Sequence, residues 1–184
     1  LGEKSLRIYD RIENLSVVDA SPLMFVYHTN PGFPILDAGT RLVINSEKTT
    51  EWLEDREVGP EAYEVAEAPQ QEAHDDVYVH RPRPDAQGNV HVGLINDRLQ
   101  LGLYWKFPIQ DMPIVNQWQR FHRGTYVTGI EPGNVSVLGR AWNRKHGYLQ
   151  YIQPGEVRAF HLEMGVLEGE KEIHAFERRS RQHT

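Results

Sequence analysis

Alternation of apolar and polar residues runs through most of this chain, and it restricts the fold more than any other feature. Side chains of a β-strand point alternately to its two faces, so a strand with one buried face repeats every second residue. About ten segments show this pattern, one of them covering 22–30, and none shows a capped helical repeat. Turn sequences such as Pro31-Gly32 and Pro154-Gly155 separate several of them. We therefore predict an all-β protein, an antiparallel β-sandwich or barrel.

The length of the chain and its local composition suggest how it is organised. Its 184 residues fit one domain spanning 1–184. Residues 46–73 are rich in Glu, Pro and Gln, which predicts a long connection with at most one extended piece. Residues 177–184 are predicted to be a polar tail. The chain begins at Leu1 and enters a strand-like segment almost at once, which we interpret as an incomplete N-terminus, without deciding between truncation, processing and an unusual start.

Charge and residue usage exclude several classes of function. The formal net charge is -6, whereas a protein that binds nucleic acid needs a basic face. The chain has no cysteine, which excludes disulfides and thiolate chemistry. We find no apolar run long enough to cross a membrane and no secretion signal. We therefore expect a cytoplasmic protein that binds neither nucleic acid nor membranes.

The stretch "PLMFVYHTN" delivers two polar side chains at the end of its predicted strand. Alternation places His28 and Asn30 on the same face, directly before a Pro-Gly-Phe-Pro turn. A histidine at a strand end is often only a hydrogen-bonded structural residue. The pairing with Asn30 nevertheless makes His28 a candidate for proton transfer near neutral pH.

The stretch "GTYVTGIEPGN" carries a single carboxylate, Glu131, on the same strand face as Val127 and Gly129. Burying a carboxylate costs several kcal/mol unless it is paired. Either this face is solvated or the acid serves chemistry. In the second case, Glu131 would act as a base toward a small substrate.

Acidic and imidazole side chains cluster in "QEAHDDVYVHRP". Asp76 and His80 share one strand face, and either could contact a substrate. His74, Asp75, Asp76 and His80 could also hold a divalent metal in a cupin-like site, although no third or fourth ligand is fixed. A plain polar strand remains the alternative.

The stretch "IVNQWQRF" places Asn116, Trp118 and Arg120 on one face, with Gln117 on the other. An aromatic ring beside amides and a guanidinium suits a sugar, whose C–H faces stack on the ring while its hydroxyls need hydrogen-bond partners. A strand tryptophan can equally belong to the core.

Taken together, these segments resemble the aldose 1-epimerase (galactose mutarotase-like) superfamily, and most closely its branch called domain of unknown function 4432. The resemblance rests on "YHTNPGFPILD", "DDVYVHRPRPDAQGNV", "NQWQRFHRGTYVTGIEPGN" and "LQYIQPGEVRAFHLEMGVLEG", which follow one another in the order typical of the family. It implies the C-terminal portion of a β-supersandwich.

The resemblance also implies a mechanism and a set of site residues. Glu131 would take the proton from the anomeric hydroxyl, and His28 would protonate the ring oxygen. Val127 and Gly129 would leave room above the sheet for the sugar ring. Such a reaction needs no cofactor and no metal. We expect the substrate contacts to come from Asn30, Asp76, His80, Gln117, Trp118 and Asn134. We expect the side-chain tips of His28 and Glu131 to lie roughly 5 to 8 Å apart across a pocket.

The chain also departs from the family pattern. Family enzymes use a further histidine and arginine from an N-terminal part that no segment here replaces. The "HTNPGFP" motif differs from that of galactose mutarotases, and either Asp75 or Asp76 could match their sugar-binding aspartate. The predicted function is isomerisation of a small-molecule sugar between its anomers, and the alternative is non-catalytic carbohydrate binding. An uncovered sheet edge would favour a homo-oligomer.

Overall fold

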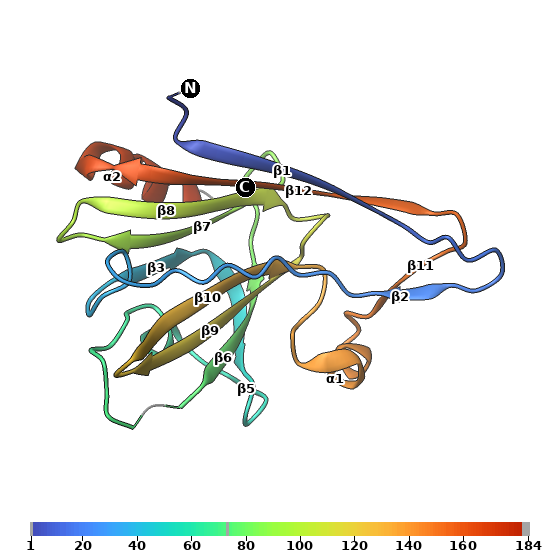
Figure 1. The fold of residues 1–184 in the computed structure, drawn as a ribbon, viewed down its shortest axis with the longest axis horizontal. Helices are drawn as coiled ribbons and strands as arrows, with labels where there is room; N and C mark the ends of the chain where they lie inside the picture. Colours follow the sequence, from blue (N-terminus) through green and yellow to red (C-terminus); the bar gives the residue numbers. More distant parts are fainter. Residues whose placement is uncertain (1, 73, 182–184) are drawn as a thin grey trace.

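Two antiparallel sheets form the body of the protein in the computed structural model, which describes residues 2–72 and 74–181. Sheet 1 has the order β1-β12-β8-β7-β3 and consists of β1 (Ser5–Glu13), β12 (Val157–Glu168), β8 (Leu101–Pro108), β7 (Asn89–Asn96) and β3 (Arg41–Ile44). Sheet 2 has the order β10-β9-β6-β4-β5 and consists of β10 (Thr125–Gly133), β9 (Ile114–His122), β6 (Asp76–Pro82), β4 (Ser46–Glu51) and β5 (Arg56–Glu57). This confirms the predicted β-sandwich (Figure 1).

The core lies between the two sheets. Its largest cluster joins inward-facing residues of sheet 1, such as Trp105 and Phe107, to residues of sheet 2, such as Val115 and Ile130. Each of these four side chains is almost fully buried. The alternation seen in the sequence therefore gives each sheet one apolar inner face.

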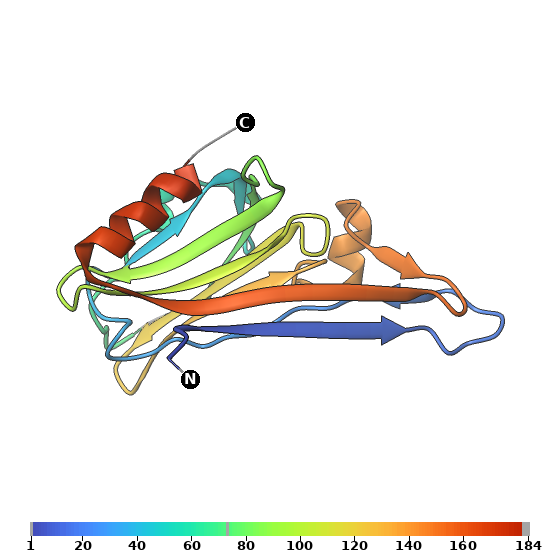
Figure 2. The same cartoon turned by 90° about the horizontal axis from the view of Figure 1, so that it is seen from above.

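A third, two-stranded sheet pairs β2 (Ser21–Leu23) with β11 (Gln150–Ile152). It lies beside the far end of the long β1–β12 pair, which extends beyond the rest of the body in Figures 1 and 2. The strand expected over 22–30 is therefore shorter than predicted, because β2 ends at Leu23. Beyond it the chain forms only isolated bridges to β10.

Within residues 2–72 and 74–181, two α-helices and one 3-10 turn (η1, Pro60–Ala62) correct the expectation of a structure without helices. Helix α1 (Gly139–Lys145) follows β10, and α2 (Gly169–Arg181) follows β12 and lies across one face of sheet 1 (Figure 2). Only Ile173, Phe176 and Ser180 of α2 are buried. Three such residues make too narrow a stripe for a helical repeat to be recognised in the sequence.

The predicted polar tail 177–184 is therefore wrong as far as Arg181, where α2 ends. Glu177 pairs with Arg41 at 2.9 Å, and Ser180 is buried. Residues 182–184 lie outside the described residues. Helix α2 also explains a glycine of β7, because a methyl group on Gly93 would lie 2.5 Å from the Phe176 ring.

The predicted connection 46–73 is wrong in its first part. Residues 46–51 form β4, which pairs with β6, and β5 extends the same sheet to its edge. The sequence pattern missed β4 because it contains almost no large apolar residue. Its pairing with β6 on one side and β5 on the other stabilises it. Beyond β5 the segment is irregular apart from η1, and Ala73 lies outside the described residues.

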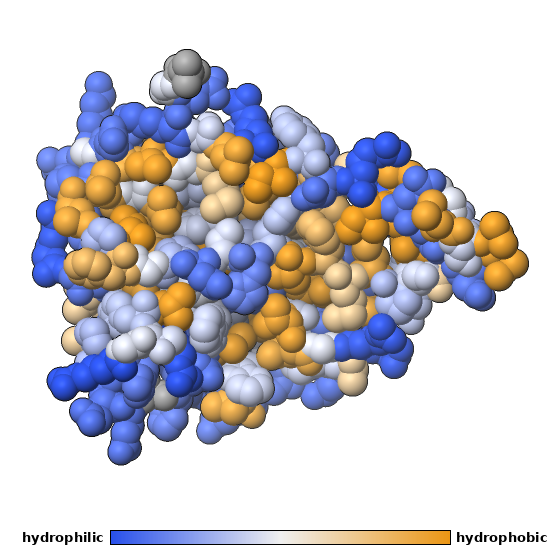
Figure 3. All heavy atoms as spheres, in the orientation of Figure 1, coloured by the Kyte–Doolittle hydropathy of each residue, from blue (hydrophilic) through white to orange (hydrophobic). Residues whose placement is uncertain are grey.

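Hydrophobic side chains are exposed at the end of the molecule formed by the loop after β1. Leu15, Val17 and Val18 are exposed there, and hydrophobic atoms gather at the corresponding end of Figure 3. Leu6 and Tyr9 are exposed along the edge strand β1. These groups are consistent with contacts to another polypeptide, and self-association stays a prediction. None of the helices in the described ranges is long and apolar enough to cross a membrane.

Candidate active site

Residues 24–32 run antiparallel beside β10 and bring the two candidate acid/base residues together. Tyr27 N donates to Pro132 O, and Ile130 N donates to Thr29 O, each at 2.9 Å. Three bridges share one register: Val26 with Gly133, Thr29 with Ile130, and Gly32 with Val127. The same register places His28 opposite Glu131, with both side chains on one face of sheet 2.

The two side chains are in direct contact. Nε2 of His28 lies 3.0 Å from Oε1 of Glu131. The Glu131 side chain is 2% exposed, whereas that of His28 is 51% exposed. Burial raises the pKa of Glu131 above its ordinary value of 4.5, and the nearby His28 opposes part of this rise. The pair thus joins a buried carboxylate of raised basicity to an imidazole that reaches solvent.

The expected separation of 5 to 8 Å was therefore wrong, although both groups do lie on one side of the sheet. A carboxylate withdrawn from water needs a partner, and the described residues offer Glu131 no ion-pair partner besides His28. The imidazole consequently closes onto the carboxylate, and no sugar ring fits between atoms 3.0 Å apart.

Gly129 allows the carboxylate to fold back along its own strand. A methyl group on Gly129 would lie 2.4 Å from Oε1 of Glu131 and 3.2 Å from Cβ of Trp118. The space above Gly129 is thus filled by the Glu131 side chain, which corrects the expectation that it receives a sugar ring. Because Gly129 has no side chain, the Glu131 carboxylate can lie directly above it.

Trp118 completes the group on this face. It pairs with Gly129 across β9 and β10, and its ring centroid lies 6.4 Å from that of His28. Its Nε1 donates to Oδ1 of Asp75 at 3.1 Å, and Arg120 donates to the same oxygen at 2.8 Å. The Arg120 bond is the main reason that the pKa of Asp75 is lowered. Asp75, rather than Asp76, therefore lies on the His28–Glu131 face.

Asp76, His80 and Gln117 do not join this group, which corrects the expectation that they contact the substrate beside His28 and Glu131. His80 is fully buried between Thr49 Oγ1 and Gln117 Oε1, each 3.0 Å from a ring nitrogen. Burial lowers the pKa of His80 to about 4, so the ring is neutral near pH 7.

The reason for this placement is the strand alternation. Gln117 neighbours Trp118 in β9 and must point to the opposite face, where its Nε2 donates to Tyr63 O at 3.0 Å. Asp76 lies opposite Gln119 and shares the Gln117 face, and burial raises the pKa of its carboxyl group. These side chains belong to the inner face of sheet 2.

The two asparagines of the expected site differ in surroundings. Asn30 is exposed, and the described residues contain no hydrogen-bond partner for its side chain, so it is available to a ligand. Asn134 is 1% exposed and fully engaged. Its Oδ1 accepts from Phe25 N at 2.7 Å, and its Nδ2 donates to Leu23 O at 2.9 Å. Asn134 therefore ties the His28 segment to the end of β10.

Replacing Asn134 with alanine should destabilise the protein. Asn134→Ala removes the side-chain hydrogen bonds to Phe25 N and Leu23 O in a largely buried place, which costs roughly 1 to 3 kcal/mol. Chemical denaturation measures this loss. Asn30→Ala is the matched control and should leave the free energy of unfolding unchanged. Equal stability of the two variants would contradict the structural role of Asn134.

One positioning residue, Asn116, was not among the expected substrate contacts. Asn116 lies opposite Glu131, and its Nδ2 donates to Glu131 O and Val135 O, each at 3.3 Å. Its Oδ1 accepts from Val137 N at 3.1 Å. Alternation had already placed Asn116 on the Trp118 face, but only the strand register shows that it faces Glu131.

The cupin-like alternative finds no support in the ligand geometry. Asp75 and His80 lie on opposite faces of sheet 2, and His80 is enclosed by Thr49 and Gln117. Over the described ranges, no group of three or more His, Cys, Asp or Glu side chains could hold a metal ion.

Comparison with solved structures shows which fold this is. The chain superposes on a proposed aldose 1-epimerase from Klebsiella pneumoniae with a TM-score of 0.89 and 22% identity, covering 97% of this chain and 47% of that one. It superposes on a galactose mutarotase-like protein from Clostridium acetobutylicum with a TM-score of 0.61 and 15% identity, covering 90% of this chain and 53% of that one. For a proposed aldose 1-epimerase from Escherichia coli K12, the TM-score is 0.62 and the identity 14%, and the match covers 89% of this chain and 56% of that one.

At these identities the likeness shows the fold alone. The chain spans about half the length of these structures. A comparison with curated proteins found no match. The family model of the domain of unknown function DUF4432 matches residues 1–166. Because this match covers most of the 184 residues of the chain, the chain belongs to the DUF4432 family.

Proposed function

We propose that the protein interconverts the α and β anomers of an aldose or modified sugar by acid/base ring opening. The observation that carries this proposal is the contact of His28 with the buried Glu131 at 3.0 Å. Buried carboxylates of raised pKa paired with imidazole are typical of sites that transfer protons near neutral pH. Trp118 and the Asp75–Arg120 pair on the same face offer stacking and hydrogen bonds to a sugar.

The proposed chemistry moves one proton at each of two sugar oxygens. Glu131 takes the proton from the anomeric hydroxyl, while His28 donates a proton to the ring oxygen. The bond between C1 and the ring oxygen breaks, which gives an open-chain aldehyde. Rotation about the C1–C2 bond and the reverse proton transfers then close the ring as the other anomer. No electrons are exchanged with a further reactant.

The sugar has to separate the two catalytic groups before it reacts. His28 is the group free to move, because it is half-exposed and lies in a segment joined to β10 only by isolated bridges. Glu131 is held by its burial, by the gap at Gly129 and by the Asn116 bond to its backbone. We therefore infer that the ligand displaces the imidazole and leaves the carboxylate in place.

The names of the matched solved structures support this class of reaction, since two are proposed aldose 1-epimerases and one is galactose mutarotase-like. This chain covers about half of each of these structures. The closed His28–Glu131 pair favours one second candidate, a carbohydrate-binding protein without catalysis. Binding without any acceleration of anomer exchange would identify it.

The pH dependence of anomer exchange tests the assignment of the base. The reaction needs Glu131 deprotonated, and burial raises its pKa. We expect the rate to fall as the pH is lowered, with the midpoint above 4.5, the ordinary pKa of a glutamate. Exchange NMR across a pH series measures this. A rate that stays constant to below that value would exclude Glu131 as the base.

A further inference from the structure

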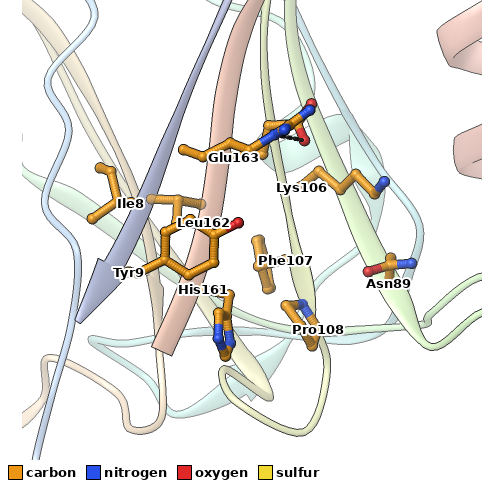
Figure 4. A pocket seen from close by; sticks show the side chains of 10 residues that line it. Ile8, Tyr9, Asn89, Lys106, Phe107, Pro108, His161, Leu162 and Glu163 are labelled. Carbon is orange, nitrogen blue, oxygen red and sulfur yellow. Dashed lines mark hydrogen bonds and ion pairs between the residues drawn. The ribbon is translucent and has the colours of Figure 1, made fainter. Parts of the chain in front are cut away.

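A hollow lies on the outer face of sheet 1 (Figure 4). Its volume is about 250 Å³. Strands β1, β7, β8 and β12 line it, and its polar members are Arg7, Tyr9, Asn89, Lys106, His161 and Glu163. We call it the outer hollow. His28 and Glu131 belong to the face formed by sheet 2 and are not among its lining residues.

The strand register explains why these side chains gather. Glu163 pairs with Arg7 on one side and with Lys106 on the other, and Tyr9 pairs with His161. All five therefore point to the outer face, while their neighbours Ile8, Phe107 and Leu162 pack against or within the core. Helix α2 borders an adjoining hollow of about 300 Å³ that shares Lys106 and Glu163.

Several groups of the outer hollow are held in place before any ligand arrives. His161 Nδ1 lies 2.8 Å from Oδ2 of Asp111, and the Tyr9 ring meets the His161 ring edge-on at 5.3 Å. Glu163 accepts from Tyr104 OH at 2.7 Å and from Arg7 at 3.4 Å. The Tyr104 bond is the first cause of the lowered pKa of Glu163, so this carboxylate is ionised near pH 7.

Other groups have unused binding capacity. The described residues contain no hydrogen-bond or ion-pair partner for the side-chain amide of Asn89 or for the ammonium group of Lys106. Both are only partly exposed. Tyr9 is 69% exposed and offers a ring surface to solvent. A ligand here would meet an aromatic ring, two free donor groups and a fixed carboxylate.

This set of groups fits a neutral polyhydroxylated ring better than an anion. Donors and acceptors alternate across the sheet, and Glu163 lies between Arg7 and Lys106. Its carboxylate offsets part of their positive charge, so the outer hollow attracts a phosphate or carboxylate less than the two cations alone would. Hydroxyl groups can both donate and accept, and the C–H face of a sugar packs on an aromatic ring. At about 250 Å³ the hollow lies below the roughly 300 to 1,000 Å³ of sites for drug-sized ligands, which suits a single ring.

We propose that the outer hollow is a second, non-catalytic carbohydrate site, which binds one neutral pyranose ring of a free sugar or of a longer glycan. The site is independent of the acid/base pair and stands or falls separately from the proposed function. Stacking on Tyr9 and hydrogen bonds to Asn89, Lys106 and Glu163 hold the ring.

Backbone amide NMR with methyl glycosides tests this site, because these sugars have no free anomeric hydroxyl and cannot undergo anomer exchange. The probes are methyl α- and β-glucopyranoside and galactopyranoside, with maltose as the chain-linked form. We expect saturable shifts at Tyr9, Asn89 and His161. Shifts with maltose alone would identify the glycan as the ligand, and equal shifts with methyl glycosides would show that one ring suffices.

Variants separate this site from the rest of the molecule. Tyr9→Ala should weaken binding about tenfold or more, since it removes the stacking surface, and Asn89→Ala should weaken it less. Tyr151→Ala, which removes an exposed tyrosine from β11, is the matched control and should bind as the wild type does. Anomer exchange should be unchanged in Tyr9→Ala. The proposal is overturned if none of the probes shifts these amides, or if neither variant weakens binding.

Discussion

Replacing Glu131 with glutamine should reduce the rate of anomer exchange by about 10²- to 10⁴-fold, the usual contribution of a general base. Glutamine keeps the size of the side chain and cannot accept the proton. Sugar affinity should stay within a few-fold of the wild type, because Trp118 and Asp75 are unchanged. Exchange NMR gives the rate, and titration of the same sugar gives the affinity.

Asp76→Asn is the matched control for this variant. It removes a partly buried carboxylate from the same sheet, but from the face that points away from His28. Its exchange rate should equal that of the wild type. The assignment of the base fails if Glu131→Gln retains the wild-type rate, or if Asp76→Asn loses as much activity.

Replacing Gly129 with alanine should reduce the exchange rate by about 10²-fold, because a displacement of about 1 Å at a reacting group has this effect. The added methyl group would lie 2.4 Å from Oε1 of Glu131, so the carboxylate must leave its position against His28. The Trp118 Cβ, at 3.2 Å, restricts relief on the other side. The exchange rate at saturating sugar measures this loss.

Gly32→Ala controls for the general effect of a methyl group at a glycine of this region. Its methyl group would lie 3.6 Å from Tyr126 O, an ordinary contact, and neither glycine has a positive φ. We expect Gly32→Ala to keep both activity and stability. Wild-type activity in Gly129→Ala would show that the position of the Glu131 carboxylate does not depend on the absence of a side chain at residue 129.

The family resemblance selected a sandwich over a barrel. Alternation in the sequence was sufficient to predict an all-β fold and most of its strands, because each sheet buries one face. It could not predict β4, whose "SEKTTE" segment has no apolar face and depends on pairing with β6 and β5. It also missed α2, which buries only three side chains against sheet 1. Both elements owe their stability to contacts that are distant in sequence.

The candidate site was predictable in part for the same reason. His28, Glu131 and Trp118 were each recognisable from their strands, and the structure places them on one face. Alternation within "NQWQ" already separated Gln117 from Trp118, yet the relative register of β6 and β9 was needed to place Asp75 beside Trp118 and Asp76 behind it. The role of Gly129 depends on a side-chain conformation that no sequence pattern specifies.

The most direct test of the proposed function is two-dimensional exchange NMR of the wild-type protein with a panel of reducing sugars that includes aldoses, uronic acids, deoxy sugars and sulfonated sugars. We predict that exchange between the α and β resonances of at least one sugar is faster than in protein-free buffer, and that His28→Gln and Glu131→Gln each reduce the acceleration by about 10²-fold or more. Sugar binding with no acceleration for any member of the panel would contradict the account and leave a carbohydrate-binding protein.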